Sequence, residues 1–172
     1  KLTQLSCQRH LTDLEQSEYV FNPVLTDKRG IKYRPGVRIC AFAEMMHHVK
    51  GKWKGDLLKL EPWQVFLLST LFGWINIDTG FRRFRESYVE IPRKNGKSIL
   101  GAIVGLYMFV VDLEGGSEVY SGATSKDQAG KVFQPARLMA KMNKNFAQKY
   151  NIDIRAESML CKSDESIFKM LI

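Results

Sequence analysis

The chain has 172 residues, of which 45% are hydrophobic and 11% aromatic. This is enough apolar material to bury a core in a domain of ordinary size, so the composition argues against a disordered chain. Lys and Arg number 26 against 18 Asp and Glu, and the formal charge of +8 favours an anionic partner such as nucleic acid or a nucleotide.

The three cysteines, Cys7, Cys40 and Cys161, are far apart and odd in number. This argues against a disulfide framework and for a reducing compartment. The longest apolar run, residues 99–111, is too short to cross a bilayer, and the basic N-terminus lacks the apolar core of a signal peptide. We therefore expect a soluble, cytoplasmic protein without a membrane segment.

The N-terminal half predicts helices separated by loops. Residues 1–36 are polar and mixed, and we expect a lead-in with a short helix over residues 5–14. Apolar residues recur at i, i+3, i+4 and i+7 over residues 37–49, which predicts a helix followed by the basic loop KGKWKGD. A proline at the start and a glycine at the end of PWQVFLLSTLFG predict the next helix, over Pro62–Phe72.

The C-terminal half alternates strands and helices. A strand over residues 87–91 leads through a basic turn into a helix over residues 96–111, and SEVYSGAT predicts a second strand. Ser125 and Gln128 form a capping-box signature for another helix, which Pro135 should kink. IDIRAESML and SIFKMLI predict two more strands. The order β-α-β-α-β-β favours an α/β fold in which helices flank a parallel sheet.

The turn after the first strand resembles a phosphate-binding loop. In the pattern G-x-x-x-x-G-K-[ST], Gly96, Lys97 and Ser98 fill the last three places, whereas Ile91 stands where the first glycine belongs. The chemistry needs a tight turn after a strand, a helix N-terminus, a lysine for the phosphate oxygens and a hydroxyl for Mg²⁺. The sequence contains each of these elements.

Two further cations lie in this turn. Arg93 and Lys94 would form a repulsive cluster if no anion occupied the loop. The small residues Gly101, Ala102 and Gly105 would let the following helix pack close to the sheet. The alternative is an exposed basic β-turn before a buried helix, because Gly-Lys-Ser also occurs by chance.

Three segments together resemble the N-terminal ATPase domain of tailed-phage terminase large subunits: LKLEPWQVFLLSTLFGW, GFRRFRESYVEIPRKNGKS and YSGATSKDQAGKVFQPA. They occur in that family's order and spacing, from about Val37 to the end of the chain. The resemblance implies a P-loop NTPase fold of the RecA/ASCE-like kind, incomplete in this chain, with ATP and Mg²⁺ as cofactors. We expect residues 1–36 to be the lead-in and residues 37–172 the N-terminal part of the ATPase domain.

The resemblance also implies how adenine is recognised. Gln64 matches the glutamine of the family's adenine-recognition segment, and Pro62 and Trp63 would shape the pocket. A glutamine amide can donate one hydrogen bond to the adenine edge and accept another. The alternative is a surface glutamine on an amphipathic helix.

In the loop, the resemblance makes Arg93 the arginine that contacts the γ-phosphate, Lys97 the invariant lysine and Ser98 the Mg²⁺ ligand. Arg93 and Lys97 are the expected catalytic residues, since phosphoryl transfer depends on positioning and charge neutralisation. The loop residues expected to bind the nucleotide are Pro92, Arg93, Lys94, Asn95, Gly96, Lys97 and Ser98. SGATSKDQA resembles the motif that links nucleotide state to DNA handling, although Ser121 and Thr124 could equally belong to a capped helix start.

One part of the family's pattern is missing. No apolar run ending in Asp-Glu supplies the Mg²⁺-orienting aspartate and the catalytic glutamate, and Asp164 and Glu165 follow CKS rather than a strand. We expect that motif, and the family's RNase H-like nuclease, after Ile172 in a longer protein. This chain, which begins with Lys1, would then be a fragment that binds ATP but hydrolyses it poorly or not at all.

Two other groups of residues have compositions that could form sites. Cys7-x-x-His10 has zinc-ligand spacing but no matching second pair, which argues against a zinc site. A basic and aromatic cluster, residues 81–85 (FRRFR), precedes the first predicted strand. It could contact DNA phosphates or the nucleotide, or it could be a solvated turn whose phenylalanines enter the core.

The sequence thus predicts the ATP-binding portion of a viral motor that translocates double-stranded DNA into a procapsid, in the cytoplasm of the infected host. The resemblance implies a homo-oligomeric ring, with the portal protein and the small terminase subunit as partners. One alternative is a helicase-type translocase, which an Asp-Glu-x-His box would mark. The other is a non-hydrolysing DNA-binding module that keeps the fold without binding ATP.

Overall fold

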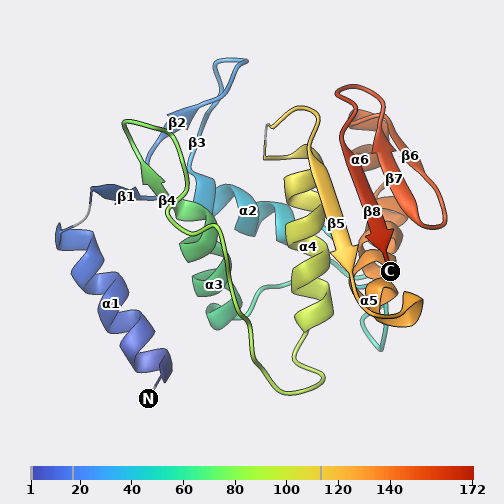
Figure 1. The fold of residues 1–172 in the computed structure, drawn as a ribbon, viewed down its shortest axis with the longest axis horizontal. Coiled ribbons are helices and arrows are strands. Elements are labelled where there is room, and N and C mark those ends of the chain that lie inside the picture. The colour runs from blue at the N-terminus through green and yellow to red at the C-terminus, as the bar shows by residue number, and fades with distance from the viewer. Residues whose placement is uncertain (1, 17, 113) are drawn as a thin grey trace. The chain divides into compact units, whose positions relative to one another are not determined.

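The computed structural model describes residues 2–16, 18–112 and 114–172. They divide into two compact units, the first comprising residues 1–41 and 60–88 and the second residues 42–59 and 89–172. Unit 1 and unit 2 are described separately below (Figure 1).

Unit 1 combines helices with short antiparallel strand pairs: β1 pairs with β4, and β2 pairs with β3. Its elements are α1 (Leu2–Gln16), β1 (Tyr19–Phe21), β2 (Leu25–Thr26), β3 (Lys32–Tyr33), most of α2 (Pro35–Glu44), α3 (Pro62–Gly73) and β4 (Trp74–Asn76). Ile39, Leu68 and Trp74 are almost fully buried and form the centre of its core. The ring of His10 meets that of Trp74 edge-on, which ties α1 to β4.

The helices predicted over residues 5–14 and 62–72 are confirmed by α1 and α3. The helix predicted over residues 37–49 is displaced, because α2 spans Pro35–Glu44. Proline has a fixed φ and no N–H, so it suits the first helical position, and the helix starts at Pro35 rather than after it. The helix ends early because His47 forms a β-bridge with Leu57.

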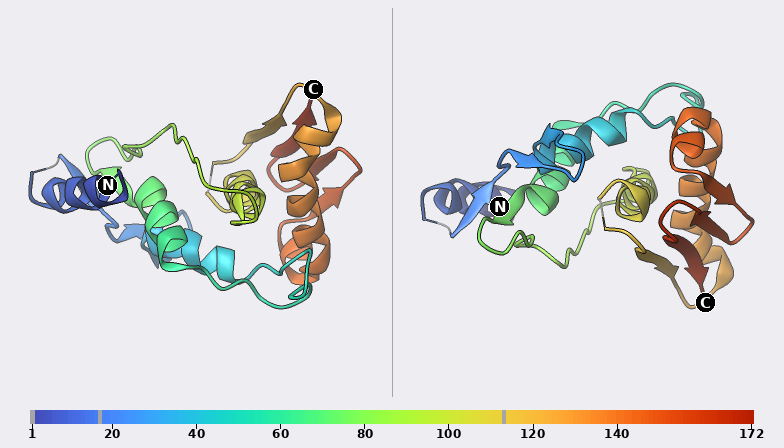
Figure 2. Two further views of the ribbon diagram at one scale, coloured as in Figure 1. Left: turned by 90° about the horizontal axis from the view of Figure 1, so that it is seen from below. Right: turned by 90° about the horizontal axis from the view of Figure 1, so that it is seen from above.

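Unit 2 is an α/β structure built on a four-stranded sheet in the order β5-β8-β7-β6. Its elements are α4 (Lys97–Val110), β5 (Glu118–Gly122), α5 (Lys126–Met142), α6 (Lys144–Lys149), β6 (Ile152–Ile154), β7 (Ser158–Cys161) and β8 (Ile167–Leu171). Helices α4 and α5 lie side by side (Figure 2), and Phe168 of β8 packs between the rings of Phe109 and Phe133 from these two helices.

The small residues of α4 allow this close packing. A Cβ atom on Gly105 would lie 2.7 Å from the Phe168 ring, and one on Gly101 would lie 3.3 Å from Val132 of α5. A larger side chain at Gly105 would push α4 away from β8, and one at Gly101 would push it away from α5. Gly101 and Gly105 therefore set the distance of α4 from its neighbours.

The strand predicted from SEVYSGAT is confirmed as β5, and the helix after it as α5, where the Ser125 hydroxyl accepts a hydrogen bond from the Gln128 N–H at 3.4 Å. Helix α5 continues through Pro135, which is buried. Because proline has no backbone N–H, one hydrogen bond of the helix is missing at this position.

Three expectations about the strands were wrong. The sheet is mixed rather than parallel, because only β5 and β8 run parallel, while β6-β7 and β7-β8 are antiparallel. The strand expected over residues 152–160 is the hairpin of β6 and β7, closed by a bond from the Arg155 N–H to the Ser158 carbonyl at 2.9 Å. The strand expected over residues 87–91 is absent from the described structure, where no neighbouring strand pairs with this segment.

None of the helices described is both long and apolar enough to cross a membrane.

Candidate functional site

Residues 91–96 form a turn that ends at the N-terminus of α4. Lys94 and Gly96 have φ angles of 72° and 78°, so left-handed residues stand on both sides of Asn95. Left-handed residues within such turns direct neighbouring backbone N–H groups into a concavity that binds anions. A lysine in this conformation is uncommon, and strained backbone of this kind concentrates at functional sites.

The Lys97 side chain folds back over this turn. Its ammonium group donates to the carbonyl oxygen of Ile91 and, at 3.0 Å, to that of Pro92. The Asn95 amide also donates to the Pro92 carbonyl, at 3.3 Å. Because hydrogen bonds between two charged groups are stronger than those to neutral carbonyls, a phosphate would be the better partner for this ammonium.

The start of α4 offers further donors. Gly96 is the N-cap residue and has no side chain to satisfy the first turn. No hydrogen bond found in the described parts of the chain uses the backbone N–H groups of Lys97, Ser98 and Ile99, and the first bond of the helix runs from Leu100 to Gly96, at 2.9 Å. These N–H groups and the helix dipole favour an anion at this end.

No carboxylate of the described residues forms an ion pair with the loop. Arg93, Lys94 and Lys97 are exposed, and none of the ion pairs among the described residues includes them. Ser98 is half-buried, one residue further into the helix. The loop is therefore a cationic, donor-rich turn.

The position of the loop in unit 2 also suits a ligand. The N-termini of α4 and α5 lie at the same end of the unit as the carboxyl ends of the parallel strands β5 and β8 (Figure 1). Ligands of open α/β folds bind outside the carboxyl ends of the strands.

The residues after β5 take different roles. The Ser121 hydroxyl donates to the Ala129 carbonyl at 2.8 Å, so it ties β5 to α5. Thr124 is exposed, and Ser125 caps α5. Of the two residues weighed here, Ser121 thus has a structural contact, whereas Thr124 presents its side chain to solvent.

The residues expected to contact adenine belong to unit 1, and the loop belongs to unit 2. Gln64 closes a capping box at the start of α3, because its side-chain oxygen accepts from the Glu61 N–H at 2.9 Å. Its amide NH₂ group and the second lone pair of its oxygen can still serve a ligand. Trp63 is 39% exposed, and Pro62 is exposed at the first helical position.

Sequence reasoning missed this capping box. Gln64 stands at the third helical position, where a capping box has Glu or Gln, but Glu61 replaces the usual Ser or Thr, so the sequence signal is weaker than that of Ser125 and Gln128. The capping bond fixes the Gln64 side chain before any ligand arrives.

The basic and aromatic cluster at residues 81–85 contains one arginine with structural contacts and other side chains that are exposed. The Arg83 guanidinium forms an ion pair with Asp13 at 2.9 Å and lies 5.5 Å from the centre of the Trp74 ring, so it joins α1 to the core of unit 1. Phe81 is 62% exposed, so the alternative in which both phenylalanines enter the core is wrong for this ring. Arg85 lies over this exposed ring, at 5.3 Å from its centre.

A cavity of about 430 Å³ lies in unit 1, lined by residues of α1 and α3, by Trp74 of β4 and by Phe84 and residues 86–88. None of the residues expected to bind ATP lines it. His10 faces it, accepts a hydrogen bond from the Trp74 indole at 3.3 Å and is partly buried. Burial lowers the pKa of His10 below its ordinary value, and the nearby Asp13 opposes this shift.

The described residues contain no group of three or more His, Cys, Asp or Glu side chains that could hold a metal ion. Cys7 and Cys40 lie in unit 1 with His10, and all three cysteines are free thiols. Asp164 accepts a bond from the Ser166 N–H at 3.1 Å in the turn before β8, which is a structural contact.

Comparison with known proteins assigns most of this chain to a family. The family model described as "Terminase large subunit, ATPase domain" matches residues 62–171, which include Gln64 and the loop at 91–98. The crystal structure of the HK97 bacteriophage large terminase is similar, with a TM-score of 0.63 and 25% sequence identity. The match covers 78% of this chain and 26% of that terminase. A search of curated proteins found no match.

Proposed function

Because this chain belongs to the family of the terminase large subunit ATPase domain, we propose that it is the ATP-binding portion of a viral DNA-packaging motor. The α/β structure of unit 2 supports a P-loop NTPase fold of the RecA/ASCE-like kind. In this proposal residues 37–172 are the N-terminal part of the ATPase domain, and residues 1–36 lead into it.

One observation carries the proposal. The turn at residues 92–97 gathers cations, left-handed residues and free N–H groups at the start of α4, and no carboxylate of the described chain neutralises it. An ATP triphosphate would satisfy the donors and the charge at the same time.

Each residue has a proposed role in binding ATP. Lys97 exchanges its carbonyl partners for β- and γ-phosphate oxygens, and Arg93 neutralises charge on the γ-phosphate. The backbone of Lys94, Asn95 and Gly96 shapes the cradle. These groups hold and orient the phosphates, which is most of what phosphoryl transfer asks of a protein.

Magnesium and adenine would bind through other groups. Ser98 would supply a hydroxyl ligand to Mg²⁺, which neutralises charge on the phosphates when bound. Gln64, already fixed by its capping bond, would give its NH₂ group to the adenine edge, with Pro62 and Trp63 beside it.

The larger machine extends beyond this chain, which spans about a quarter of the HK97 large terminase (26%). We propose that the whole protein couples ATP hydrolysis to translocation of double-stranded DNA into the procapsid. It would act in the host cytoplasm as a soluble homo-oligomeric ring, with the portal protein and small terminase subunit as partners and a C-terminal nuclease. Family membership supports these proposals.

The test is titration calorimetry of Mg-ATP into the chain and into Lys97→Ala, with hydrolysis followed in the same samples. Loss of two charge-assisted bonds should weaken binding by roughly 100-fold or more, since each such bond contributes about 1.5–3 kcal/mol. Turnover should be negligible in both proteins. Lys162→Ala, which removes an exposed lysine of the same unit, should bind ATP as the parent does.

Equal weak heats from the parent and Lys97→Ala would show that the loop is an ordinary basic turn. Intact DNA binding in that case would support the non-hydrolysing DNA-binding module instead.

A further inference from the structure

A second basic loop lies in unit 2, between α2 and α3 in the sequence. Its ends are joined by the His47–Leu57 bridge, by a bond from the His48 N–H to the Asp56 carbonyl at 2.8 Å and by one from the Gly55 N–H to the His48 carbonyl at 2.9 Å. Gly51 and Gly55 have φ angles of 78° and 101°, which turns of this kind require. The backbone of the loop is therefore fixed by its own hydrogen bonds.

This loop is also attached to the rest of unit 2. The Asn143 amide donates to the Met45 carbonyl at 3.2 Å, and Phe42 packs against the rings of Tyr107 and Phe146, both at 5.7 Å between ring centres. These contacts come from α4, from α6 and from the junction between α5 and α6. The loop is thus held by the same unit that carries the phosphate-binding turn.

The fixed backbone presents a tryptophan to solvent. Trp53 is 55% exposed, although burying a side chain of this size is normally favourable. One face of the ring is supported by His48, at 5.9 Å between ring centres, and the Lys52 ammonium lies 4.3 Å from the ring centre. Exposed, supported tryptophans are typical of the centres of binding surfaces.

Lysines alternate with glycine and tryptophan around this ring, in the order Lys50, Gly51, Lys52, Trp53 and Lys54. All three lysines are exposed, and no ion pair within the described chain neutralises them. Asp56 is the only carboxylate between His47 and Lys59.

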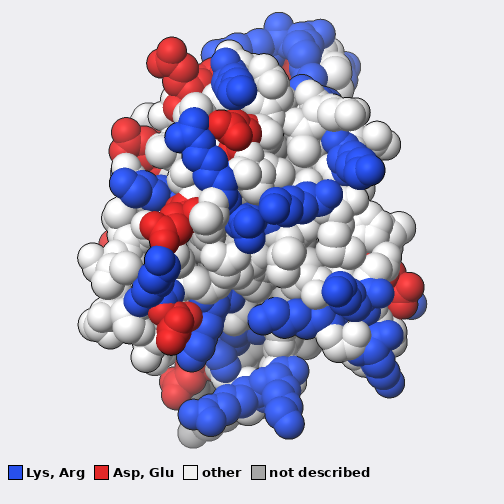
Figure 3. All heavy atoms as spheres, turned by 90° about the vertical axis from the view of Figure 1, so that its right-hand side faces the viewer, with Lys and Arg blue, Asp and Glu red and all other residues white. Residues whose placement is uncertain are grey.

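The rest of unit 2 adds positive charge. Figure 3 shows a face on which Lys and Arg side chains outnumber Asp and Glu, on the side where α6 and β6–β8 lie in Figure 1. The combination of clustered lysines and an exposed aromatic ring matches what a nucleic-acid strand offers, which is phosphates at regular intervals with sugar and base between them.

We propose that the loop of residues 50–56 is a nucleic-acid contact. The ammonium groups of Lys50, Lys52 and Lys54 meet phosphates of the DNA backbone, and the Trp53 ring packs against the deoxyribose between them. The inference rests on the proposed function only in taking DNA as the partner. It requires neither bound ATP nor an intact phosphate-binding turn.

The test is fluorescence anisotropy of a labelled DNA duplex titrated with the chain at several salt concentrations. Lys52→Gln combined with Lys54→Gln should lower the slope of log affinity against log salt by about 2, since each phosphate contact contributes roughly 1. Trp53→Ala should weaken binding severalfold with a smaller change in slope, because it removes an apolar contact and no charge. The matched control is Lys28→Gln with Lys32→Gln, which removes the same charge from exposed positions of unit 1 and should keep the parent slope.

Thermal melting of each variant shows that it is folded. The inference is overturned if the loop variants bind DNA as the parent does, if the control loses as much as the loop pair, or if the parent does not bind. It is also overturned if vesicles with anionic lipid, titrated in parallel, bind the parent more tightly than DNA and lose binding in Trp53→Ala. Lys97→Ala should bind DNA normally, so this proposal and the ATP proposal can fail separately.

Discussion

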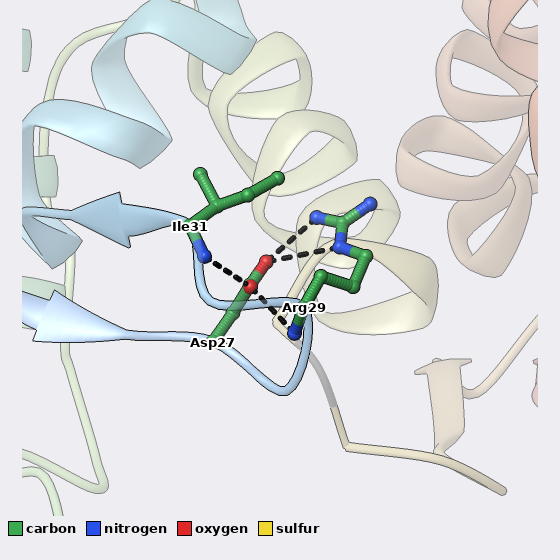
Figure 4. Close-up of polar contacts among 3 residues, drawn as sticks. All are labelled: Asp27, Arg29 and Ile31. Carbon is green, nitrogen blue, oxygen red and sulfur yellow. Dashed lines mark hydrogen bonds and ion pairs between the residues drawn. The ribbon is translucent and has the colours of Figure 1, made fainter.

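Two basic turns in this molecule contain similar residues, but the cationic side chains in them have different hydrogen-bond partners. In the turn between β2 and β3, the Asp27 carboxylate accepts bonds from the Arg29 guanidinium, at 3.1 and 2.7 Å, and from the Ile31 N–H at 3.0 Å (Figure 4). In the turn before α4, Lys97 has only backbone carbonyls as partners, and Arg93 is exposed without an ion pair in the described structure.

The two turns share one backbone feature, a left-handed glycine. Gly30 and Gly96 have φ angles of 79° and 78°. What differs is the acceptor. In the first turn the Asp27 carboxylate accepts the hydrogen bonds of the arginine, so the arginine there stabilises the fold. The second turn has donors in excess, and its charge is complementary to an anion from outside.

Removing the arginine from each turn tests whether one turn binds ATP and the other stabilises the fold. Arg93→Ala should weaken Mg-ATP binding by roughly 10- to 100-fold, because a bond to a charged group contributes about 1.5–3 kcal/mol, and it should leave the melting temperature unchanged. Arg29→Ala should do the reverse, lowering the melting temperature and leaving ATP affinity intact. Calorimetry and thermal melting on both variants measure the two effects.

The distinction between the turns would be wrong if Arg29→Ala weakened ATP binding as much as Arg93→Ala. Lys28→Ala, next to Arg29 and exposed, is the control for nonspecific loss of charge and should change neither quantity.

A second experiment tests whether the backbone of the two turns has different roles. Gly30→Ala and Gly96→Ala each force alanine into a left-handed conformation, which costs about 1–2 kcal/mol. Both should lower the free energy of unfolding by that amount in urea titrations. Only Gly96→Ala should also weaken ATP binding, because its backbone belongs to the proposed cradle. A loss of ATP affinity in both variants would point to a general effect of stability on binding.

The parts of this structure that were predicted correctly depend on nearby residues. Helices α3, α4 and α5 follow from apolar periodicity, from Pro62 at a helix start and from Ser125 at a cap. The turn before α4 was found because Gly-Lys-Ser is a contiguous motif, and its role in binding ATP stays a prediction. These signals lie within one or two turns of chain, so a single sequence contains them.

The parts that were missed depend on distant residues. A strand at residues 87–91 requires a neighbour to pair with, and Tyr88 is instead 88% exposed. The position of Arg83 depends on Asp13 of α1, which no local pattern connects to it. The hairpin of β6 and β7 was missed for a different, local reason. The turn between its strands, residues 155–157, contains no glycine or proline that would have marked it.

The smallest effect expected is the pH dependence of the completed turn. Hydrogen bonds from the Arg29 side chain, and then from the Ile31 backbone, lower the pKa of Asp27 below its ordinary value of 3.8. A carboxylate whose folded pKa is lowered stabilises the fold fully above its unfolded pKa and loses this contribution as the pH falls through the folded pKa. Asp27→Asn should therefore be less stable than the parent at neutral pH, and the gap should close below about pH 4. Urea titrations across this range measure it. A gap for Asp27→Asn that persisted at the lowest pH would mean that the shape of the carboxylate, rather than its charge, completes the turn.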